Sequence, residues 1–180
     1  MKQFLLSVLL LIGCNVFAQS DTSSIAKNGV YNTAADYQSK HLSFAYNNAR
    51  EDGIKFKNPI GHYHQLWIKT KDSLYKFYDT DIWGYRQNGI DYRLYNGEMY
   101  EVNYVGNICI YYLPIVSSGS SGYFTCFSKD INSAVLELNK ENLLEAYHSD
   151  PLFIEKLKQS KGGIYKMSKT KGRFLFIDWL

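Results

Sequence analysis

The stretch that decides the fold is residues 82–105, which read IWGYRQNGIDYRLYNGEMYEVNYV. Asn88-Gly89 and Asn96-Gly97 divide it into three runs rich in aromatic and aliphatic residues. Asn-Gly is the strongest short signal for a β-hairpin, because both residues tolerate a positive φ. In the run Ile90–Tyr95, apolar and charged side chains alternate, as a strand with one buried face requires. The stretch therefore predicts three successive antiparallel strands.

The same pattern of short runs and turn residues extends over residues 54–128. Regular spacing of such runs is typical of an antiparallel meander, which can also curl into an open barrel. Asn107–Val116 is almost entirely apolar, which predicts a central strand covered on both faces. A serine- and glycine-rich loop at residues 117–122 then leads into a strand that ends at Ser128.

Helix signals flank this β-rich region on both sides. Thr33 and Asp36 have the spacing of a capping box, which predicts a helix over residues 34–40. Asn139 and Asp150-Pro151 each precede a helical pattern in the C-terminal part. Residues 164–179 predict a closing hairpin. We therefore expect an α+β fold: an antiparallel meander or open barrel of about six to nine strands, one short N-terminal helix and two helices in the C-terminal half.

The N-terminus has the organisation of an export signal. An apolar run at residues 4–13 follows Lys2, and small residues precede a cleavage position after Ala18. The run is shorter than the roughly 20 residues that a membrane-spanning helix needs. We therefore expect a signal peptide at residues 1–18, a flexible leader at 19–28 and a single domain at 29–180.

This export signal predicts a secreted or periplasmic protein and excludes nuclear, cytosolic and nucleotide-driven functions. The residues Leu11-Ile12-Gly13-Cys14 also fit the pattern for lipid attachment, so a lipoprotein anchored through Cys14 is the alternative. No later apolar run reaches membrane-spanning length, so we expect no transmembrane segment after cleavage.

Two cysteines, Cys109 and Cys126, remain after cleavage, and an exported protein can join such a pair in a disulfide. A symmetric hairpin about the 117–122 loop would place Cys126 opposite Leu113, four residues out of register with Cys109. A bridge needs Cα atoms within about 7 Å of each other. Two buried thiols acting as small apolar residues are the other interpretation, and the sequence leaves both open.

Aromatic residues are the strongest indication of function, because the chain contains 16 Tyr and 3 Trp. A tyrosine or tryptophan combines a large flat apolar face with a polar group, which suits recognition of sugars and peptides. We predict a binding platform on neighbouring strands, although aromatic residues also favour strands for packing reasons alone. Its members are Trp67, Trp83, Tyr85, Tyr92 and Tyr95.

No motif in the chain indicates a catalytic site, a metal site or a cofactor. His62 and His64 share one face of a predicted strand, but a zinc or copper site needs a third or fourth ligand. Paired carboxylates for glycoside hydrolysis depend on distances in space that a sequence does not reveal. We therefore expect a non-enzymatic protein that binds a glycan or another ligand. A small exported hydrolase acting on glycan or peptide is the alternative.

The C-terminal segment 156–173 carries seven lysine and arginine residues and no acidic residue. For an exported protein this charge favours an anionic envelope component over nucleic acid as partner. Solvated helix and turn faces are the simpler interpretation. A structural or assembly role is a third possibility, for which a long unpaired edge strand or a large apolar patch would be the sign.

Three segments resemble parts of uncharacterised exported proteins of Bacteroidetes. These are Gly29-Val30-Tyr31 with Asp36-Tyr37, Asp81-Ile82-Trp83-Gly84-Tyr85 with Gly89, and Leu138–Lys158. The Val-Phe-Ala-Gln cleavage region has the same appearance. The resemblance implies an envelope or secreted location and no known activity, so no functional residue is carried over from it.

Overall fold

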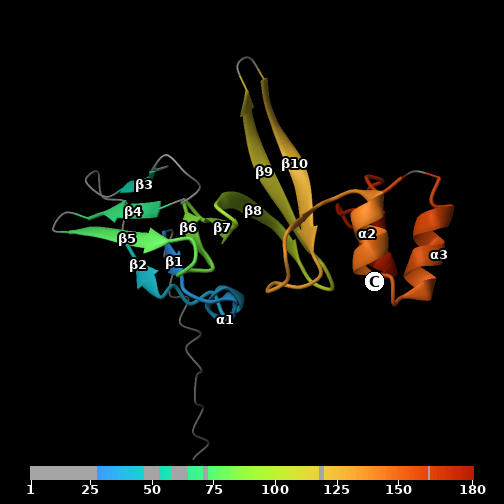
Figure 1. Cartoon of the computed structure of the whole chain (residues 1–180), viewed down its shortest axis with the longest axis horizontal. Helices are drawn as coiled ribbons and strands as arrows, with labels where there is room; N and C mark the ends of the chain where they lie inside the picture. Colours follow the sequence, from blue (N-terminus) through green and yellow to red (C-terminus); the bar gives the residue numbers. More distant parts are fainter. Residues whose placement is uncertain (1–27, 47–52, 58–64, 71–72, 118–119, 162) are drawn as a thin grey trace, which may run out of the picture.

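The structure is a computed structural model, and it describes residues 28–46, 53–57, 65–70, 73–117, 120–161 and 163–180. These residues form one open antiparallel sheet of eight strands, a second sheet of three strands and three α-helices (Figure 1). The expectation of an α+β fold built on an open antiparallel sheet is therefore confirmed. The predicted signal peptide lies outside the described residues.

The large sheet has the strand order β11-β10-β9-β8-β7-β6-β1-β2, so its central strands pair in chain order as a meander. At both Asn-Gly turns the two residues have positive φ, 52° and 83° at Asn88-Gly89 and 49° and 78° at Asn96-Gly97. The strands are β1 (Gly29–Tyr31), β2 (Phe44–Ala45), β6 (Gly84–Gln87), β7 (Ile90–Tyr95), β8 (Glu98–Val105), β9 (Cys109–Ser117), β10 (Ser120–Ser128) and β11 (Leu136–Glu137).

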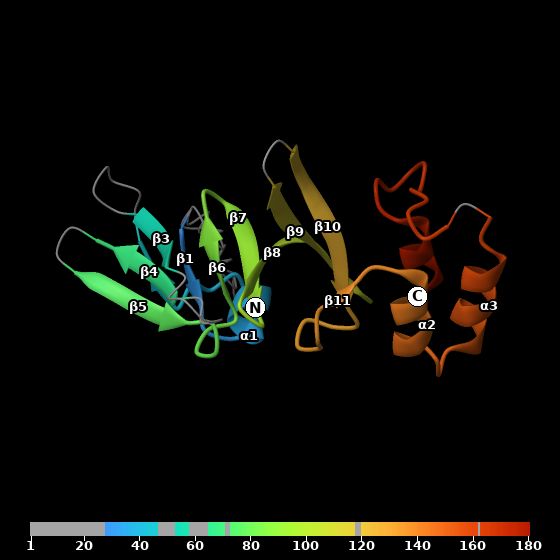
Figure 2. The same cartoon turned by 45° about the horizontal axis from the view of Figure 1, so that its top comes forward.

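The small sheet contains β3 (Gly53–Lys57), β4 (Gln65–Lys69) and β5 (Leu74–Tyr78). The sequence predicts one meander through this region, whereas the chain separates into two sheets, because β1 pairs with the edge of β6. The two sheets pack through a cluster of buried side chains, and Figure 2 shows them side by side. The buried members of this cluster are Val30, Tyr46, Leu66, Ile68, Ile82, Tyr85 and Leu94.

Residues 139–180, which we call the helical cap, cover the other end of the large sheet. They contain α2 (Lys140–Ala146), α3 (Pro151–Gln159) and the 3-10 helix η1 (Leu175–Trp179). The predicted caps are confirmed, since the side chains of Asn139 and Asp150 accept hydrogen bonds from the N–H groups of Asn142 and Phe153. The cap packs on β9 and β10 through Ile110, Phe127, Leu143, Phe153 and Phe176, among other buried residues.

The predicted closing hairpin is wrong. Only one bridge, between Met167 and Phe174, joins its two arms within the described residues, and the second arm continues as η1. Phe176 and Ile177 are both buried in the cluster under the helical cap. A strand would direct neighbouring side chains to opposite faces, whereas a helical turn can bury both.

The first helix, α1 (Ala34–Gln38), covers the face of the large sheet opposite the helical cap. Its capping box is confirmed, because Thr33 and Asp36 exchange the two expected hydrogen bonds. The ring of Tyr37 stacks on Trp83 with 4.4 Å between the ring centroids. The helix therefore closes this face near β1 and β6.

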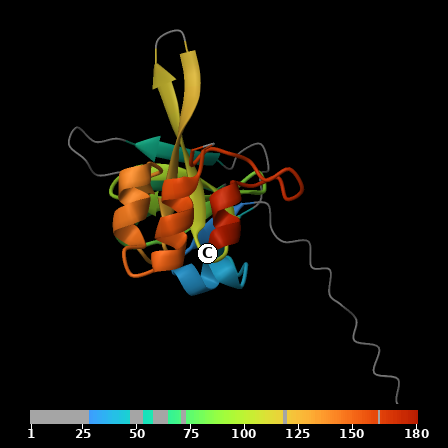
Figure 3. The same cartoon turned by 90° about the vertical axis from the view of Figure 1, so that its right-hand side faces the viewer.

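The β9–β10 hairpin projects beyond the rest of the molecule (Figures 1 and 3). The start of β9 is buried on both faces, from Ile108 to Tyr111, but residues 112–115 are half-buried or exposed. The prediction of a strand covered on both faces is thus correct only for this first part. Cys126 pairs with Tyr111 and not with Leu113, because Ser117 pairs directly with Ser120.

The two cysteines therefore lie two residues out of register, and both are free and buried. This agrees with the interpretation of buried thiols. Burial raises the pKa of the Cys126 thiol to about 11, so its sulfur stays protonated at neutral pH. Within the described residues, none of the helices is long and apolar enough to cross a membrane.

Candidate functional site

A row of directly paired residues crosses five strands of the large sheet. Tyr85 pairs with Tyr92, Tyr92 with Glu101, Glu101 with Tyr112, and Tyr112 with Thr125. Side chains of paired residues in antiparallel strands point to the same face. The row therefore places a tyrosine on each side of the Glu101 carboxylate.

The exposure of this row increases toward the projecting hairpin. Tyr85 is buried under the small sheet and stacks on Tyr92, with 4.9 Å between ring centroids. Tyr92, Glu101 and Tyr112 are half-buried. Tyr123, on the same face, is 63% exposed and lies 6.0 Å from Tyr112, centroid to centroid. We call the solvent-accessible set the tyrosine face: Tyr92, Glu101, Asn103, Tyr112 and Tyr123.

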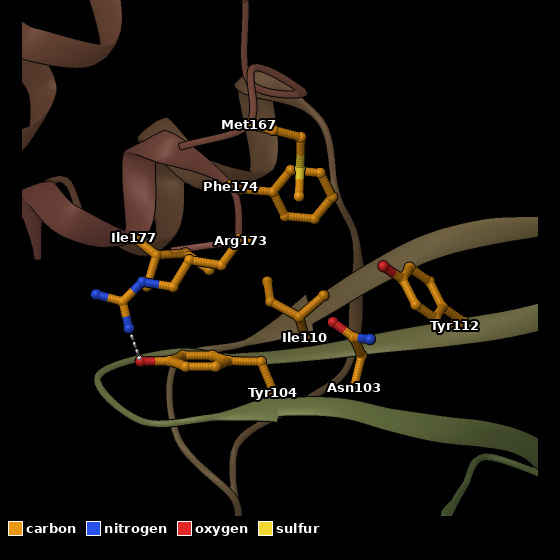
Figure 4. Close-up of a pocket in the computed structure, with 9 residues that line it drawn as sticks. Asn103, Tyr104, Ile110, Tyr112, Met167, Arg173, Phe174 and Ile177 are labelled. Carbon is orange, nitrogen blue, oxygen red and sulfur yellow. Dashed lines mark hydrogen bonds between the residues drawn. The ribbon is translucent and has the colours of Figure 1, made fainter. Parts of the chain in front are cut away.

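A β-bulge brings Tyr104 onto this face beside Asn103. The pairing of β8 with β9 shifts register between Val102 and Tyr104, so one residue of β8 has no counterpart. As a consequence Asn103 and Tyr104, although adjacent in sequence, line the same cavity (Figure 4). Regular alternation would have sent one of them to the opposite face.

This cavity, of about 70 Å³, lies where the tyrosine face meets the helical cap. Tyr112 lines it from the sheet, and Met167 and Phe174 line it from the cap (Figure 4). Arg173 donates a hydrogen bond to the Tyr104 hydroxyl over 2.9 Å and is paired with Asp178. The cap therefore holds this end of the tyrosine face in place.

Asp178 also neutralises part of the basic segment 156–173. Its carboxylate accepts hydrogen bonds from Arg173 and from the Lys171 ammonium group, each over 3.0 Å. These two hydrogen bonds hold the pKa of Asp178 below its usual range, and the one from Arg173 has the larger effect. Two of the seven basic charges thus have a partner inside the protein.

Glu101 differs from Asp91, the acidic residue of the neighbouring strand that Lys40 and Arg86 accompany, because no cation is paired with it. Among the described residues, its carboxylate has no ion pair and no side-chain hydrogen bond within bonding distance. The pKa of Tyr92 is raised, mainly by burial and further by the charge of Glu101. A half-buried carboxylate between tyrosine rings can accept hydrogen bonds from a ligand and attract positive charge.

The opposite face of the same strands is closed around Arg93, which is only 3% exposed. Its guanidinium group donates to the Tyr111 hydroxyl over 2.9 Å and to the Ser133 carbonyl over 2.8 Å. The rings of Trp83, Tyr95 and Tyr111 lie 5.2 to 5.9 Å from its central carbon. The Trp83 indole is further held by a hydrogen bond to the Ile131 carbonyl.

A second hollow, of about 230 Å³, opens farther along that face, and Tyr100, Leu113, Phe124, Cys126 and Glu137 line it. Both cavities are smaller than the roughly 300–1,000 Å³ typical of small-molecule pockets. Neither of these two brings two carboxylates together.

The five residues of the predicted platform lie in three places. Tyr92 belongs to the tyrosine face, and the buried ring of Tyr85 stacks against it. Trp83 and Tyr95 surround Arg93 on the opposite face. Trp67 lies on β4 of the small sheet, opposite the core side chains of that strand and 4.8 Å from the Lys76 ammonium group.

Sequence reasoning missed Glu101, Asn103, Tyr112 and Tyr123. A signal for the first was present, because two-residue Asn-Gly turns set the register of both hairpins and align Tyr85, Tyr92 and Glu101. No such signal was available for Tyr112, which lies beyond the bulge.

His62 and His64 lie outside the described residues. The residues that the structure does describe contain no cluster of three metal-binding side chains. Comparison of the chain with protein-family models, curated proteins and solved structures finds no match.

Proposed function

We propose that this is an exported, non-enzymatic protein that binds a glycan across its tyrosine face. The observation that carries the proposal is the row Tyr92, Glu101, Tyr112, which stays accessible where the small sheet and the helical cap leave the large sheet uncovered. The row presents aromatic rings and hydrogen-bonding groups side by side, which is the combination that sugar rings require.

The geometry suits an extended ligand. Tyr92 and Tyr112 are separated by two strand spacings, about 10 Å, and Tyr123 adjoins Tyr112. Flat apolar faces of successive sugars can lie on these rings while hydroxyl groups reach Glu101 and Asn103. The cavity beside Met167 and Phe174 then lies at one end of the bound glycan.

Export is part of the proposal and rests on the sequence. We expect cleavage after Ala18 and a secreted or periplasmic location, with lipid attachment at Cys14 as the alternative. Intact-mass measurement of the protein from soluble and membrane fractions separates the two. Recovery of the chain inside the cell with residues 1–18 attached would contradict export.

The binding proposal is tested with the mature chain, residues 19–180, on a glycan array, followed by titration calorimetry of the best hits. Tyr112→Ala and Tyr123→Ala should each weaken binding about tenfold, the scale of one aromatic contact. Tyr78→Ala is the matched control, because Tyr78 is 45% exposed on β5 of the small sheet. It should leave the affinity unchanged.

Unchanged affinity in Tyr112→Ala and Tyr123→Ala would contradict the proposal, as would an array without hits. Loss of binding in Trp67→Ala alone would move the site to the small sheet. Release of shortened glycan during the titration would favour the hydrolase alternative.

A further inference from the structure

We infer that the glycan carries a protonated amine on a sugar ring and that Glu101 binds this amine at the centre of the tyrosine face. The inference rests on the proposed function and adds the chemical class of the ligand. It begins from a half-buried carboxylate that has two tyrosines as its direct cross-strand neighbours, Tyr92 and Tyr112.

Glu101 has no ion pair among the described residues, and Arg173, the cation at the end of the tyrosine face, is paired with Asp178. Its next neighbours along the same face of β8 are Met99 and Asn103, which carry no charge. Arg93 and Asp91, on the neighbouring strand, point to the opposite face and have partners there. An incoming cation would therefore meet a carboxylate that is free to form charge-assisted hydrogen bonds, which are about twice as strong as neutral ones.

The rings beside Glu101 strengthen the preference for a cation. The face of a tyrosine ring attracts a positive group that approaches within about 6 Å of its centroid. Tyr92 and Tyr112 flank the carboxylate on both sides, so an ammonium group bound there lies beside a negative charge and between two tyrosine rings. A neutral N-acetyl group can donate its N–H to the carboxylate, but it brings no positive charge to the carboxylate or to the rings, and it is bulkier.

Several features favour an amino sugar over a lysine side chain. A lysine presents a narrow aliphatic stem, which would cover little of the ring area that Tyr112 and Tyr123 expose. A sugar ring covers this area and directs its hydroxyl groups toward the amide of Asn103 and the tyrosine hydroxyls. The polar groups around Glu101 are therefore those that a hydroxyl-rich cation uses.

The test compares two oligosaccharides of equal length, one of glucosamine and one of N-acetylglucosamine, by titration calorimetry against the mature protein. The glucosamine form should bind about tenfold more tightly, the low end of what a hydrogen bond to a charged group contributes. Glu101→Gln, which keeps the size of the side chain, should abolish this preference. Added salt should reduce it in the wild type.

Glu98→Gln is the matched control. Glu98 lies on the same strand but pairs with Tyr95 on the opposite face, and it is exposed. This variant removes the same charge from the protein and should keep the full preference for the amine. A preference that is lost equally in both variants would reflect net charge alone and would overturn the inference.

Other outcomes separate the two proposals. Equal binding of both oligosaccharides, with binding lost in Tyr112→Ala, would contradict the inference of an amine and leave the proposal of glycan binding intact. Binding of neither form, with a neutral glycan from the array bound at Tyr112, would do the same. Tight, Glu101-dependent binding of a lysine tripeptide without binding of the amino sugar would overturn the sugar and point to a basic peptide.

Discussion

Arg93 and Glu101 lie on adjacent strands of one sheet, each beside aromatic rings, yet on opposite faces and with opposite roles. Arg93 is enclosed by Trp83, Tyr95 and Tyr111, and its guanidinium group has three hydrogen-bond acceptors. Glu101 remains half-buried with no partner among the described residues. Charged and aromatic side chains therefore enclose one another on one face and stay accessible on the other.

The two faces differ in which segments of the protein lie over them. Helix α1 and the segment that contains Ile131 and Ser133 lie over the Arg93 face, and they supply a carbonyl acceptor and apolar contacts. Burial of a charge costs several kcal/mol unless hydrogen bonds compensate it, and the two terminal nitrogens of Arg93 form such bonds, whereas its Nε has no partner among the described residues. On the Glu101 face the covers lie to either side, so water or a ligand must satisfy the carboxylate.

The largest effect should come from alkaline pH, which acts on the covered tyrosines. Burial raises the pKa of Tyr100, Tyr111 and Tyr147 to about 12 in each case, from 10.0. Above pH 10 the unfolded state loses these protons while the folded state keeps them, so the free energy of unfolding falls as pH rises from about 10 to about 12. Circular dichroism and tyrosinate absorbance should change together in this range. Full ionisation of these tyrosines in a protein with native circular dichroism would contradict the burial.

Arg93→Ala should lower the free energy of unfolding by roughly 3 kcal/mol, because it leaves a void and an unpaired Ser133 carbonyl. Urea denaturation measures the change. Arg93→Met refills much of the void, so the difference between the two variants reports packing and the remainder reports hydrogen bonding. A change below about 1 kcal/mol in Arg93→Ala would show that the covered face does not depend on this residue.

The neighbouring tyrosines of β9 offer the sharpest test of the two faces. Tyr111→Phe removes a buried hydroxyl that bonds Arg93 and Ser128, and it should cost about 1–2 kcal/mol of unfolding free energy. Tyr112→Phe removes a hydroxyl from the tyrosine face, and its effect on stability should stay within about 0.5 kcal/mol. Equal costs in the two variants would mean that the tyrosine face is as closed as the Arg93 face.

The smallest effect on stability is expected for Glu101→Gln. The carboxylate has no partner among the described residues, so its replacement by a neutral amide of the same size should change the unfolding free energy by less than about 0.5 kcal/mol. Thermal and urea denaturation would detect a larger loss, which would assign Glu101 a structural role. Unchanged stability together with a loss of amine binding would show that Glu101 acts in binding and not in folding.

Several parts of the fold could be predicted because their causes are local. The Asn-Gly turns predicted two hairpins, and Thr33, Asn139 and Asp150 predicted the starts of three helices, all as observed. Each signal depends on the backbone preference or hydrogen bond of a few adjacent residues. The closing hairpin failed for the opposite reason, since the burial of Phe176 and Ile177 against the helices decided the local conformation.

An aromatic surface on the sheet could be predicted from the sequence, but not which residues share it. The sequence places Tyr92, Trp83 and Tyr95 on one surface, whereas Trp83 and Tyr95 lie on the opposite face around Arg93. Trp67 was assigned to it although β4 belongs to a separate sheet. Which aromatic residues share a face depends on the register across the bulge at Asn103 and on which strand pairs with β6. Neither can be recognised from neighbouring residues in the sequence.

By itself, the sequence determined the α+β class, the meander, the helix caps and an abundance of tyrosine, because short-range hydrogen bonding and alternation are written in neighbouring residues. The tertiary structure alone decided which tyrosines stay exposed and which charge is enclosed. That choice follows from the covers, α1 on one face and the small sheet and helical cap on the other, since burial depends on contacts between residues far apart in the chain.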